Sequence, residues 1–152
     1  MLYYNAIENN LLSDDIFTHL NHKDLLPPNA TIREFYSFFT RLNPGDQRTY
    51  LHSINNIHLN LQLADAITVA LPDSKFDTVY LDAFSPDVNP ELWSTTFFFT
   101  LKSSMKKGAL LSTYSAKSNV RKAMLDAGFE VVRKKGAKGK REMLVAKKSF
   151  ID

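Results

Sequence analysis

Apolar positions along the chain fall into short runs that predict strands. Leu2–Ile7 predicts a strand, and the short apolar run Val79–Leu81 predicts a buried one. Ile57–Leu63 alternates strictly between apolar and polar residues, as a strand with one solvated face does. Three later strands are predicted at 109–114, 129–132 and 142–146. The connection between the last two is too short for a helix, so they are expected to form an antiparallel pair.

Between these strands the apolar residues recur at helical spacing. Ser13 begins a predicted helix that ends near His22, and Ile32, Phe35, Tyr36 and Phe39 mark a second one. Further helices are predicted through Ile67 and Leu71, along the stripe Trp93, Phe97, Leu101 and Met105, and from Ser115 to Gly128. This order predicts one α/β domain over residues 1–152, with a mostly parallel sheet closed by an antiparallel C-terminal strand.

The stretch from Phe76 to Trp93 is central to the functional interpretation. A short apolar run ends on the carboxylate of Asp82, a partly aromatic loop follows, and Asn89-Pro90-Glu91 has the cap, proline and acid of a helix start. Open α/β sheets bind ligands at the carboxyl ends of their strands, next to such helix starts. The alternative for Asp82 is a structural cap of the turn that follows it.

Acids follow three of the predicted parallel strands: Glu8, Asp65 and Asp82. Phe84, Pro86 and Tyr114 add apolar or aromatic walls at neighbouring strand ends. Acids for a ribose and a base edge, together with apolar walls for rings, suit a cofactor that contains a nucleoside. The alternatives are a plain exposed glutamate at Glu8 and a helix cap at Asp65.

Composition removes several other function classes. The 152 residues include no cysteine, no glycine-rich phosphate loop, no nucleophile elbow and no histidines at metal-ligand spacing, so no metal is expected. No run is long enough to span a bilayer and no signal pattern opens the chain, so we expect a cytoplasmic protein without a membrane partner.

Charge is distributed unevenly along the chain. Residues 1–100 carry 5 Lys and Arg against 12 Asp and Glu, whereas residues 101–152 carry 14 against 4. A basic third on an otherwise acidic chain indicates contact with a polyanion such as RNA. The alternative is a solvated, lysine-rich surface.

Several motifs together resemble a known family. They are the segment FDTVYLDAFSPDVNPELW, the Thr-Tyr-Ser strand end, Ala-Gly-Phe and Lys-Arg-Glu-Met, in this order along the chain. This part of the chain is similar to the methyltransferase domain of the bacterial MnmC-type proteins, which act on the wobble uridine of tRNA. Residues 1–75 match more loosely, through YYNAIE and LQLADA.

The resemblance implies a Rossmann-like class I methyltransferase sheet, S-adenosyl-L-methionine as cofactor and tRNA as partner. It implies methyl transfer to the exocyclic amine of 5-aminomethyl-2-thiouridine, with an oxidoreductase acting on the same nucleoside. By motif, Glu8 binds the cofactor ribose, Asp65 its adenine, and Asp82 with Ala83 the region of the methyl donor. Asp82 and Phe84 are the expected catalytic residues. The expected substrate or RNA contacts are Pro86, Tyr114, Lys140 and Arg141.

The chain departs from the family at one central point. The family has a further strand, followed by a glycine-rich loop, that comes before the strand corresponding to Leu2–Ile7 in the chain. In the family's sheet this strand lies between the strands that correspond to Leu2–Ile7 and Phe76–Asp82, and this sequence lacks it. We therefore expect both strands to have unpaired edges, and we expect a further segment upstream of Met1. If the 152 residues are the whole protein, we expect no measurable binding of S-adenosylmethionine. An inactive, RNA-binding fragment of such a domain is the alternative function.

Overall fold

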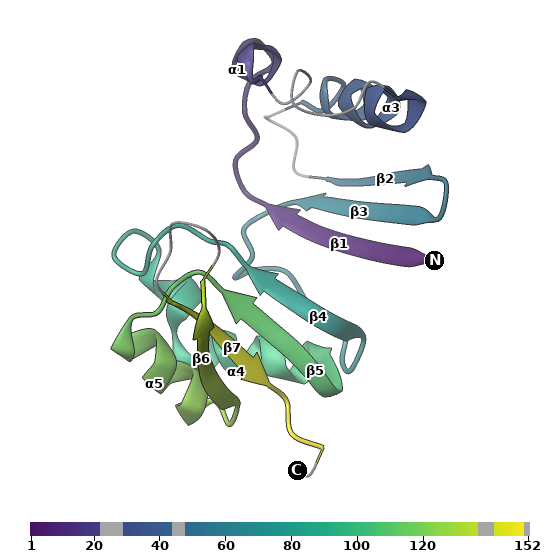
Figure 1. Ribbon diagram of the computed structural model, residues 1–152. Helices are drawn as coiled ribbons and strands as arrows, with labels where there is room; N and C mark the ends of the chain where they lie inside the picture. Colours follow the sequence, from purple (N-terminus) through teal and green to yellow (C-terminus); the bar gives the residue numbers. More distant parts are fainter. Residues whose placement is uncertain (22–28, 44–47, 137–141, 151–152) are drawn as a thin grey trace. The chain divides into compact units, whose positions relative to one another are not determined.

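The computed structural model describes residues 1–21, 29–43, 48–136 and 142–150 (Figure 1). They form two compact units, Met1–Val69 and Ala70–Asp152, and each unit is described by itself. Both units combine a small sheet with helices, in agreement with the α/β class expected from the sequence. A single domain over residues 1–152 stays a prediction.

The first unit contains a three-stranded sheet in the order β1-β3-β2. β1 (Leu2–Glu8) runs parallel to β3 (Ile57–Leu63), and β2 (Thr49–Ile54) runs antiparallel to β3. Two helices, α1 (Asp14–His19) and α3 (Ala30–Phe39), lie between β1 and β2 in the chain. In Figure 1, α3 runs along one face of this sheet.

The core of the first unit follows directly from the alternation in β3. Leu59, Leu61 and Leu63 point to one face and are buried against Phe38 and Leu42. At the start of α3, the side chain of Asn29 accepts a hydrogen bond of 2.9 Å from the amide of Ile32. The cap satisfies one of the amides that a helix start leaves without a partner, and it fixes where α3 begins. In α1, the Ser13 hydroxyl donates to the Asp15 carboxylate, and this hydrogen bond lowers the pKa of Asp15.

The second unit contains a four-stranded sheet in the order β4-β5-β7-β6. β4 (Phe76–Leu81) is parallel to β5 (Met105–Thr113), whereas β7 (Glu142–Lys147) is antiparallel to both β5 and β6 (Glu130–Lys135). The predicted antiparallel pair at the C-terminal end of the chain is therefore confirmed. The connections contain η1 (Pro90–Trp93), α4 (Thr95–Ser104) and α5 (Ser118–Asp126).

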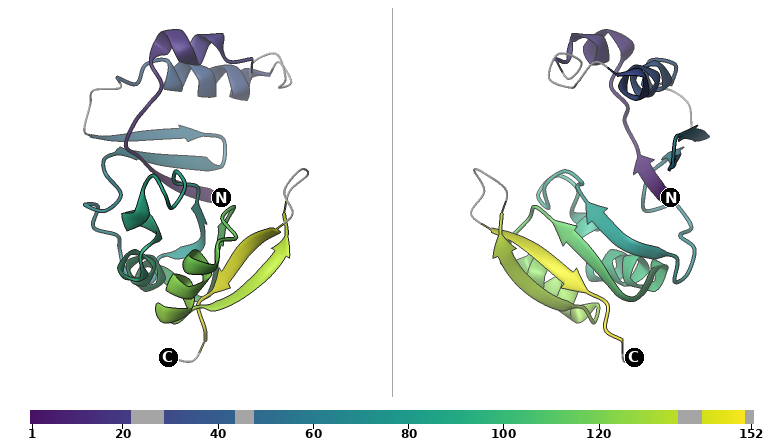
Figure 2. Two further views of the ribbon diagram at one scale, coloured as in Figure 1. Left: turned by 90° about the vertical axis from the view of Figure 1, so that its left-hand side faces the viewer. Right: turned by 45° about the vertical axis from the view of Figure 1, so that its right-hand side comes forward.

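Helices α4 and α5 cover one face of this second sheet (Figure 2). The side chains of Phe98, Leu111, Met124 and Leu144 are almost completely buried between the helices and the strands. The Ser94 hydroxyl caps α4 by accepting a hydrogen bond of 3.2 Å from the amide of Phe97. The second unit thus has a core of its own.

Two predicted elements differ from the structure. The expected helix through Ile67 and Leu71 is a short turn that begins at Asp65, because Leu71 precedes Pro72 and the residue before a proline is disfavoured in helical conformation. The expected helix along the Trp93 stripe ends at Ser104. Met105 is completely buried, as the stripe predicted, but as the first residue of β5.

Among the described residues, β1 is an edge strand of the first sheet and β4 is an edge strand of the second. The expectation that these two strands have unpaired edges is therefore confirmed. No strand of the described residues hydrogen-bonds to the free side of either one. The prediction of a buried strand at Val79–Leu81 is wrong in this structure, because Tyr80 on this edge strand is 70% exposed. The strands consequently form two sheets where the sequence predicted one.

Candidate functional site

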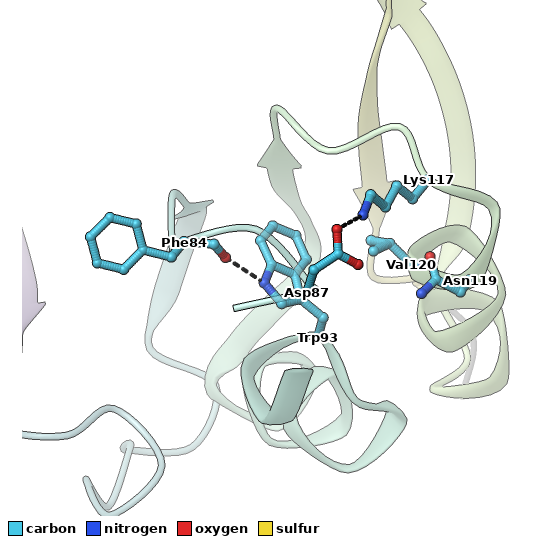
Figure 3. Close-up of polar contacts among 6 residues, drawn as sticks. All are labelled: Phe84, Asp87, Trp93, Lys117, Asn119 and Val120. Carbon is cyan, nitrogen blue, oxygen red and sulfur yellow. Dashed lines mark hydrogen bonds and ion pairs between the residues drawn. The ribbon is translucent and has the colours of Figure 1, made fainter. Parts of the chain in front are cut away.

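The loop that follows β4 is held by side chains from two other segments. The indole Nε1 of Trp93 donates a hydrogen bond of 2.8 Å to the carbonyl oxygen of Phe84 (Figure 3). The hydroxyl of Tyr114 donates one of 2.9 Å to the carbonyl oxygen of Ala83. Leu81 pairs with Thr113 in the parallel register of β4 and β5, so this loop and Tyr114 extend from neighbouring strand ends.

The same loop exposes the two residues that were expected to be catalytic. Asp82 is exposed, and the side chain of Phe84 is 73% exposed, with its ring pointing away from Trp93 in Figure 3. Pro86 is buried within a turn closed by a hydrogen bond of 2.8 Å from the amide of Val88 to the carbonyl oxygen of Ser85. The loop therefore offers a carboxylate and an aromatic ring to solvent, while its proline packs inward.

A third contact joins this loop to the start of α5. The Lys117 ammonium forms an ion pair and hydrogen bond with the Asp87 carboxylate (Figure 3). Lys117 is the N-cap residue of α5, and in the first turn of that helix the Asn119 side chain accepts a hydrogen bond of 2.9 Å from the amide of Val120. Because both charged side chains are largely exposed, the ion pair contributes little to stability, about 0–1 kcal/mol.

Glu8 and Asp65 lie together in the first unit. Glu8 is the last residue of β1, and Asp65 lies two residues past the end of the parallel strand β3. The carbonyl oxygen of Glu8 accepts a hydrogen bond of 3.0 Å from the amide of Ala64. Both side chains are exposed. The Glu8 carboxylate accepts a hydrogen bond of 2.9 Å from the amide of Asn10, and the Asp65 carboxylate accepts one of 3.0 Å from the amide of Ile67. Asp65 thus caps a turn, and its second carboxylate oxygen is not used in that hydrogen bond.

The predicted site residues consequently fall into three groups. Glu8 and Asp65 are brought together in the first unit, and Asp82, Ala83, Phe84, Pro86 and Tyr114 are brought together in the second, with Pro86 buried. Lys140 and Arg141 lie outside the described residues. A row formed by all three acids stays a prediction.

Sequence reasoning missed the contributions of Trp93 and Lys117 to this loop. The apolar stripe predicts that Trp93 lies on the buried face of a helix, and Lys117 adds only to the positive charge of the C-terminal third. One signal was available for Trp93, because a buried tryptophan requires an acceptor for its N–H group and this chain has a single tryptophan. Nothing in the sequence indicated the partner of Lys117.

No group of three or more histidine, aspartate or glutamate side chains in the described part of the chain could hold a metal ion. In the same part of the chain, no helix is long and apolar enough to cross a membrane.

Comparison with known sequences decides the family. Residues 29–149 match the model of a family described as S-adenosyl-L-methionine-dependent methyltransferase. The chain belongs to this family. Its cofactor is therefore S-adenosyl-L-methionine, as the resemblance implied. The match spans α3 to β7 and includes the whole loop that Trp93 and Tyr114 hold.

Curated relatives refine this result. The chain is 42% identical over 87 residues to a protein of Actinobacillus pleuropneumoniae named "tRNA 5-methylaminomethyl-2-thiouridine biosynthesis bifunctional protein MnmC", with 57% of this chain aligned. It is 36% identical over 118 residues to the protein of the same name from Leptospira borgpetersenii, with 76% of this chain aligned. The chain spans only 12% and 18% of the length of these two relatives. It is thus an MnmC-like methyltransferase domain.

A solved structure supports the fold. The MnmC2 protein of Aquifex aeolicus matches with a TM-score of 0.61 at 24% sequence identity, and the match covers 95% of this chain and 52% of that one. At this identity the likeness shows the Rossmann-like methyltransferase fold alone.

The residues present can be tested against the family's cofactor. Glu8 and Asp65 place two exposed carboxylates at adjacent ends of parallel strands, where a ribose diol and the amine of an adenine find acceptors. They fit the nucleoside part of S-adenosylmethionine. For its methionine part, none of the five glycines in the sequence stands in a glycine-rich strand-to-helix loop.

Proposed function

We propose that this chain is a methyltransferase domain that acts on tRNA, methylating the exocyclic amine of 5-aminomethyl-2-thiouridine at the wobble position. The observation that carries the proposal is the loop after β4, where the exposed Asp82 and Phe84 lie on a backbone fixed by Trp93 and Tyr114. The family match supports the reaction type. The names of the relatives support the nucleoside.

In this proposal Asp82 acts on the substrate amine. An amine attacks only as the neutral base, so a carboxylate that accepts its proton, or orients its N–H groups, favours the reaction. S-adenosylmethionine supplies an electrophilic methyl group when bound. Positioning of the amine contributes most of the remaining acceleration, since good orientation lowers the barrier of such reactions by about 7–11 kcal/mol.

The other site residues have binding roles. Glu8 and Asp65 hold the ribose and the adenine of the cofactor, and the backbone at Ala83 borders the place of the methyl group. The exposed ring of Phe84 forms a wall against which the uracil ring of the target nucleotide stacks. Lys140 and Arg141 contact RNA phosphates, in line with the net charge of the C-terminal third. An oxidoreductase acting on the same nucleoside is the proposed partner.

The test is nucleoside analysis after incubation of the full-length protein, including any segment upstream of Met1, with S-adenosylmethionine and tRNA that contains 5-aminomethyl-2-thiouridine. We expect the methylaminomethyl product from the wild-type protein and a rate at least about 100-fold lower from Asp82→Asn, because the carboxylate is lost at constant size. Asp77→Asn is the matched control, since Asp77 is an exposed aspartate of β4 that pairs with Lys106 away from this loop. A wild-type rate from Asp82→Asn overturns the assignment of Asp82.

The same preparation distinguishes the alternative function, which the basic C-terminal third favours. A chain that binds tRNA but transfers no methyl group is an RNA-binding module, and the catalytic proposal is then wrong. Binding is measured on filters over a range of salt concentrations. A steep salt dependence that flattens in Lys140→Ala and Arg141→Ala supports phosphate contacts by these two residues.

A further inference from the structure

Two side chains hold two consecutive carbonyl groups of the loop after β4. Trp93 comes from η1 and donates to the carbonyl of Phe84 (Figure 3), whereas Tyr114 directly follows β5 and donates to the carbonyl of Ala83. Orienting two adjacent peptide groups from two separate segments restricts rotation about the bonds between them. The backbone that carries Phe84 is therefore fixed from both sides.

The donors are themselves held firmly. The side chain of Trp93 is only 4% exposed, and the rings of Trp93 and Tyr114 meet edge to face with their centroids 5.9 Å apart and an angle of 83° between their planes. This is a preferred geometry for a pair of aromatic rings. The two hydrogen-bond donors thus form one packed unit under the loop.

The rest of the loop is anchored as well. The Ser85–Val88 turn is closed by its own backbone hydrogen bond, Pro86 is buried, and Asp87 pairs with Lys117. The side chain of Phe84 stays exposed between these anchors. A single exposed phenylalanine is ordinary on a protein surface. A loop whose residues are anchored one after another, from Ala83 to Asp87, is the feature that requires an explanation.

We infer that Trp93 and Tyr114 are positioning residues for the proposed methyl-transfer site, an inference that rests on the function proposed above. They hold the carbonyls of Ala83 and Phe84 so that the Asp82 carboxylate and the Phe84 ring keep one orientation toward the target nucleoside. Neither side chain needs to touch the substrate. A site of this kind gains its rate from geometry fixed before the substrate binds, and it loses rate when the supporting hydrogen bonds are removed.

The test uses two variants that each remove one donor and keep an aromatic ring. Tyr114→Phe removes only the hydroxyl, and Trp93→Phe removes the indole N–H group. Tyr80→Phe is the matched control, because Tyr80 is an exposed tyrosine of β4 whose hydroxyl makes none of the contacts of the loop. Far-UV circular dichroism establishes that each variant is folded, and Tyr114→Phe remains informative if Trp93→Phe fails to fold.

Two measurements are made on each variant of the full chain. Amide hydrogen exchange of residues 83–85 reports how firmly the loop is held. Steady-state methylation of tRNA that contains 5-aminomethyl-2-thiouridine separates kcat from KM. For Tyr114→Phe we expect loop exchange to rise at least about tenfold, kcat to fall about tenfold, and KM for S-adenosylmethionine to stay within about twofold. Tyr80→Phe is expected to match the wild type in both measurements.

Fluorescence provides a third, independent signal. Trp93 is the only tryptophan of the chain, so its emission reports directly on the contact with Tyr114. We expect Tyr114→Phe to alter the emission maximum or the quantum yield of Trp93. We expect no change in Tyr80→Phe.

The outcomes separate this inference from the proposed function. Methyl transfer by the wild type with unchanged kcat in both donor variants overturns the inference and leaves the proposed function standing. A fall in kcat without increased exchange of the loop also overturns it, because the effect does not then act through the loop. If the wild type transfers no methyl group, the proposed function is wrong. Amide hydrogen exchange of residues 83–85 then decides whether Trp93 and Tyr114 hold the loop. Exchange at the wild-type rate in both donor variants overturns the inference as well.

Discussion

At the scale of single residues, Gly128 shows how one position fixes the end of a helix. Its φ angle is +83°, and its amide donates a hydrogen bond of 2.8 Å to the carbonyl of Leu125, while the amide of Phe129 reaches Met124 at 3.1 Å. This pattern ends α5 and turns the chain into β6. The left-handed conformation is costly for residues that carry a Cβ atom, so glycine is the natural choice here.

We expect Gly128→Val to destabilise the second unit by about 1–2 kcal/mol, because a β-branched residue is strained in the left-handed region. A Cβ atom at this position would lie 2.6 Å from Nζ of Lys102, the flexible end of a side chain, so the backbone is the main source of strain. Gly128→Asn is the matched variant, and it should lower the stability of the second unit much less, since asparagine tolerates the left-handed conformation. Urea unfolding followed by the emission of Trp93 measures both. Equal losses would contradict the argument.

Residue-scale prediction from the sequence succeeded where position along a strand decides the outcome. Asp82 and Tyr114 were expected at neighbouring strand ends, and the register of β4 and β5 places them there. Prediction from the sequence failed where the hydrogen-bond partner of a side chain depends on the path of a loop. The hydrogen bond from Trp93 to the Phe84 carbonyl is local in sequence, yet no spacing rule relates an indole to a particular loop carbonyl.

At the scale of elements, helix caps and apolar periodicity located most segments, and the errors have physical causes. Met105 continues the i, i+4 spacing of the α4 stripe, but it is the first residue of β5, and its side chain is buried there. A helix and a strand can each place an apolar side chain in the core, so apolar spacing alone does not tell them apart at this position. The strand β2 was missed altogether. The signal for it was the pair Asn55-Asn56, where Asn55 has a φ angle of +52° and the chain turns between β2 and β3.

For helix starts, we expect Asn29→Ala to destabilise the first unit by about 1 kcal/mol, because the amide of Ile32 loses its acceptor. Asn29→Asp and Asn29→Ser keep an acceptor oxygen at this position and should retain most of the stability. Thermal unfolding followed by circular dichroism at 222 nm is the measurement, with the emission of Trp93 recorded in parallel for the second unit. If Asn29→Asp loses as much as Asn29→Ala, the cap is not the cause.

At the scale of the whole molecule, the edges of the sheets differ in how they are protected. β6 carries Arg133, Lys134 and Lys135, and charged side chains discourage pairing with another chain. β4 has one charged residue, Asp77, whose carboxylate is paired with Lys106 at 2.9 Å. β1 is charged only at its last residue, Glu8. The fourth edge strand, β2, carries no Asp, Glu, Lys or Arg. Because unprotected edge strands are templates for intermolecular pairing, β1, β2 and β4 are the expected sites of self-association.

We therefore expect Tyr80→Lys to slow the self-association of the chain at high concentration. Tyr80 lies on the edge strand β4 and is 70% exposed, so a lysine fits there without disturbing the core. Val132→Lys adds the same charge to β6, an edge that is already basic, and should have little effect. Light scattering at matched concentration, with urea unfolding to check that both variants keep wild-type stability, measures the difference. If the two variants reduce scattering equally, net charge is the cause and the edge of β4 is not the site, since only the position of the new lysine distinguishes them.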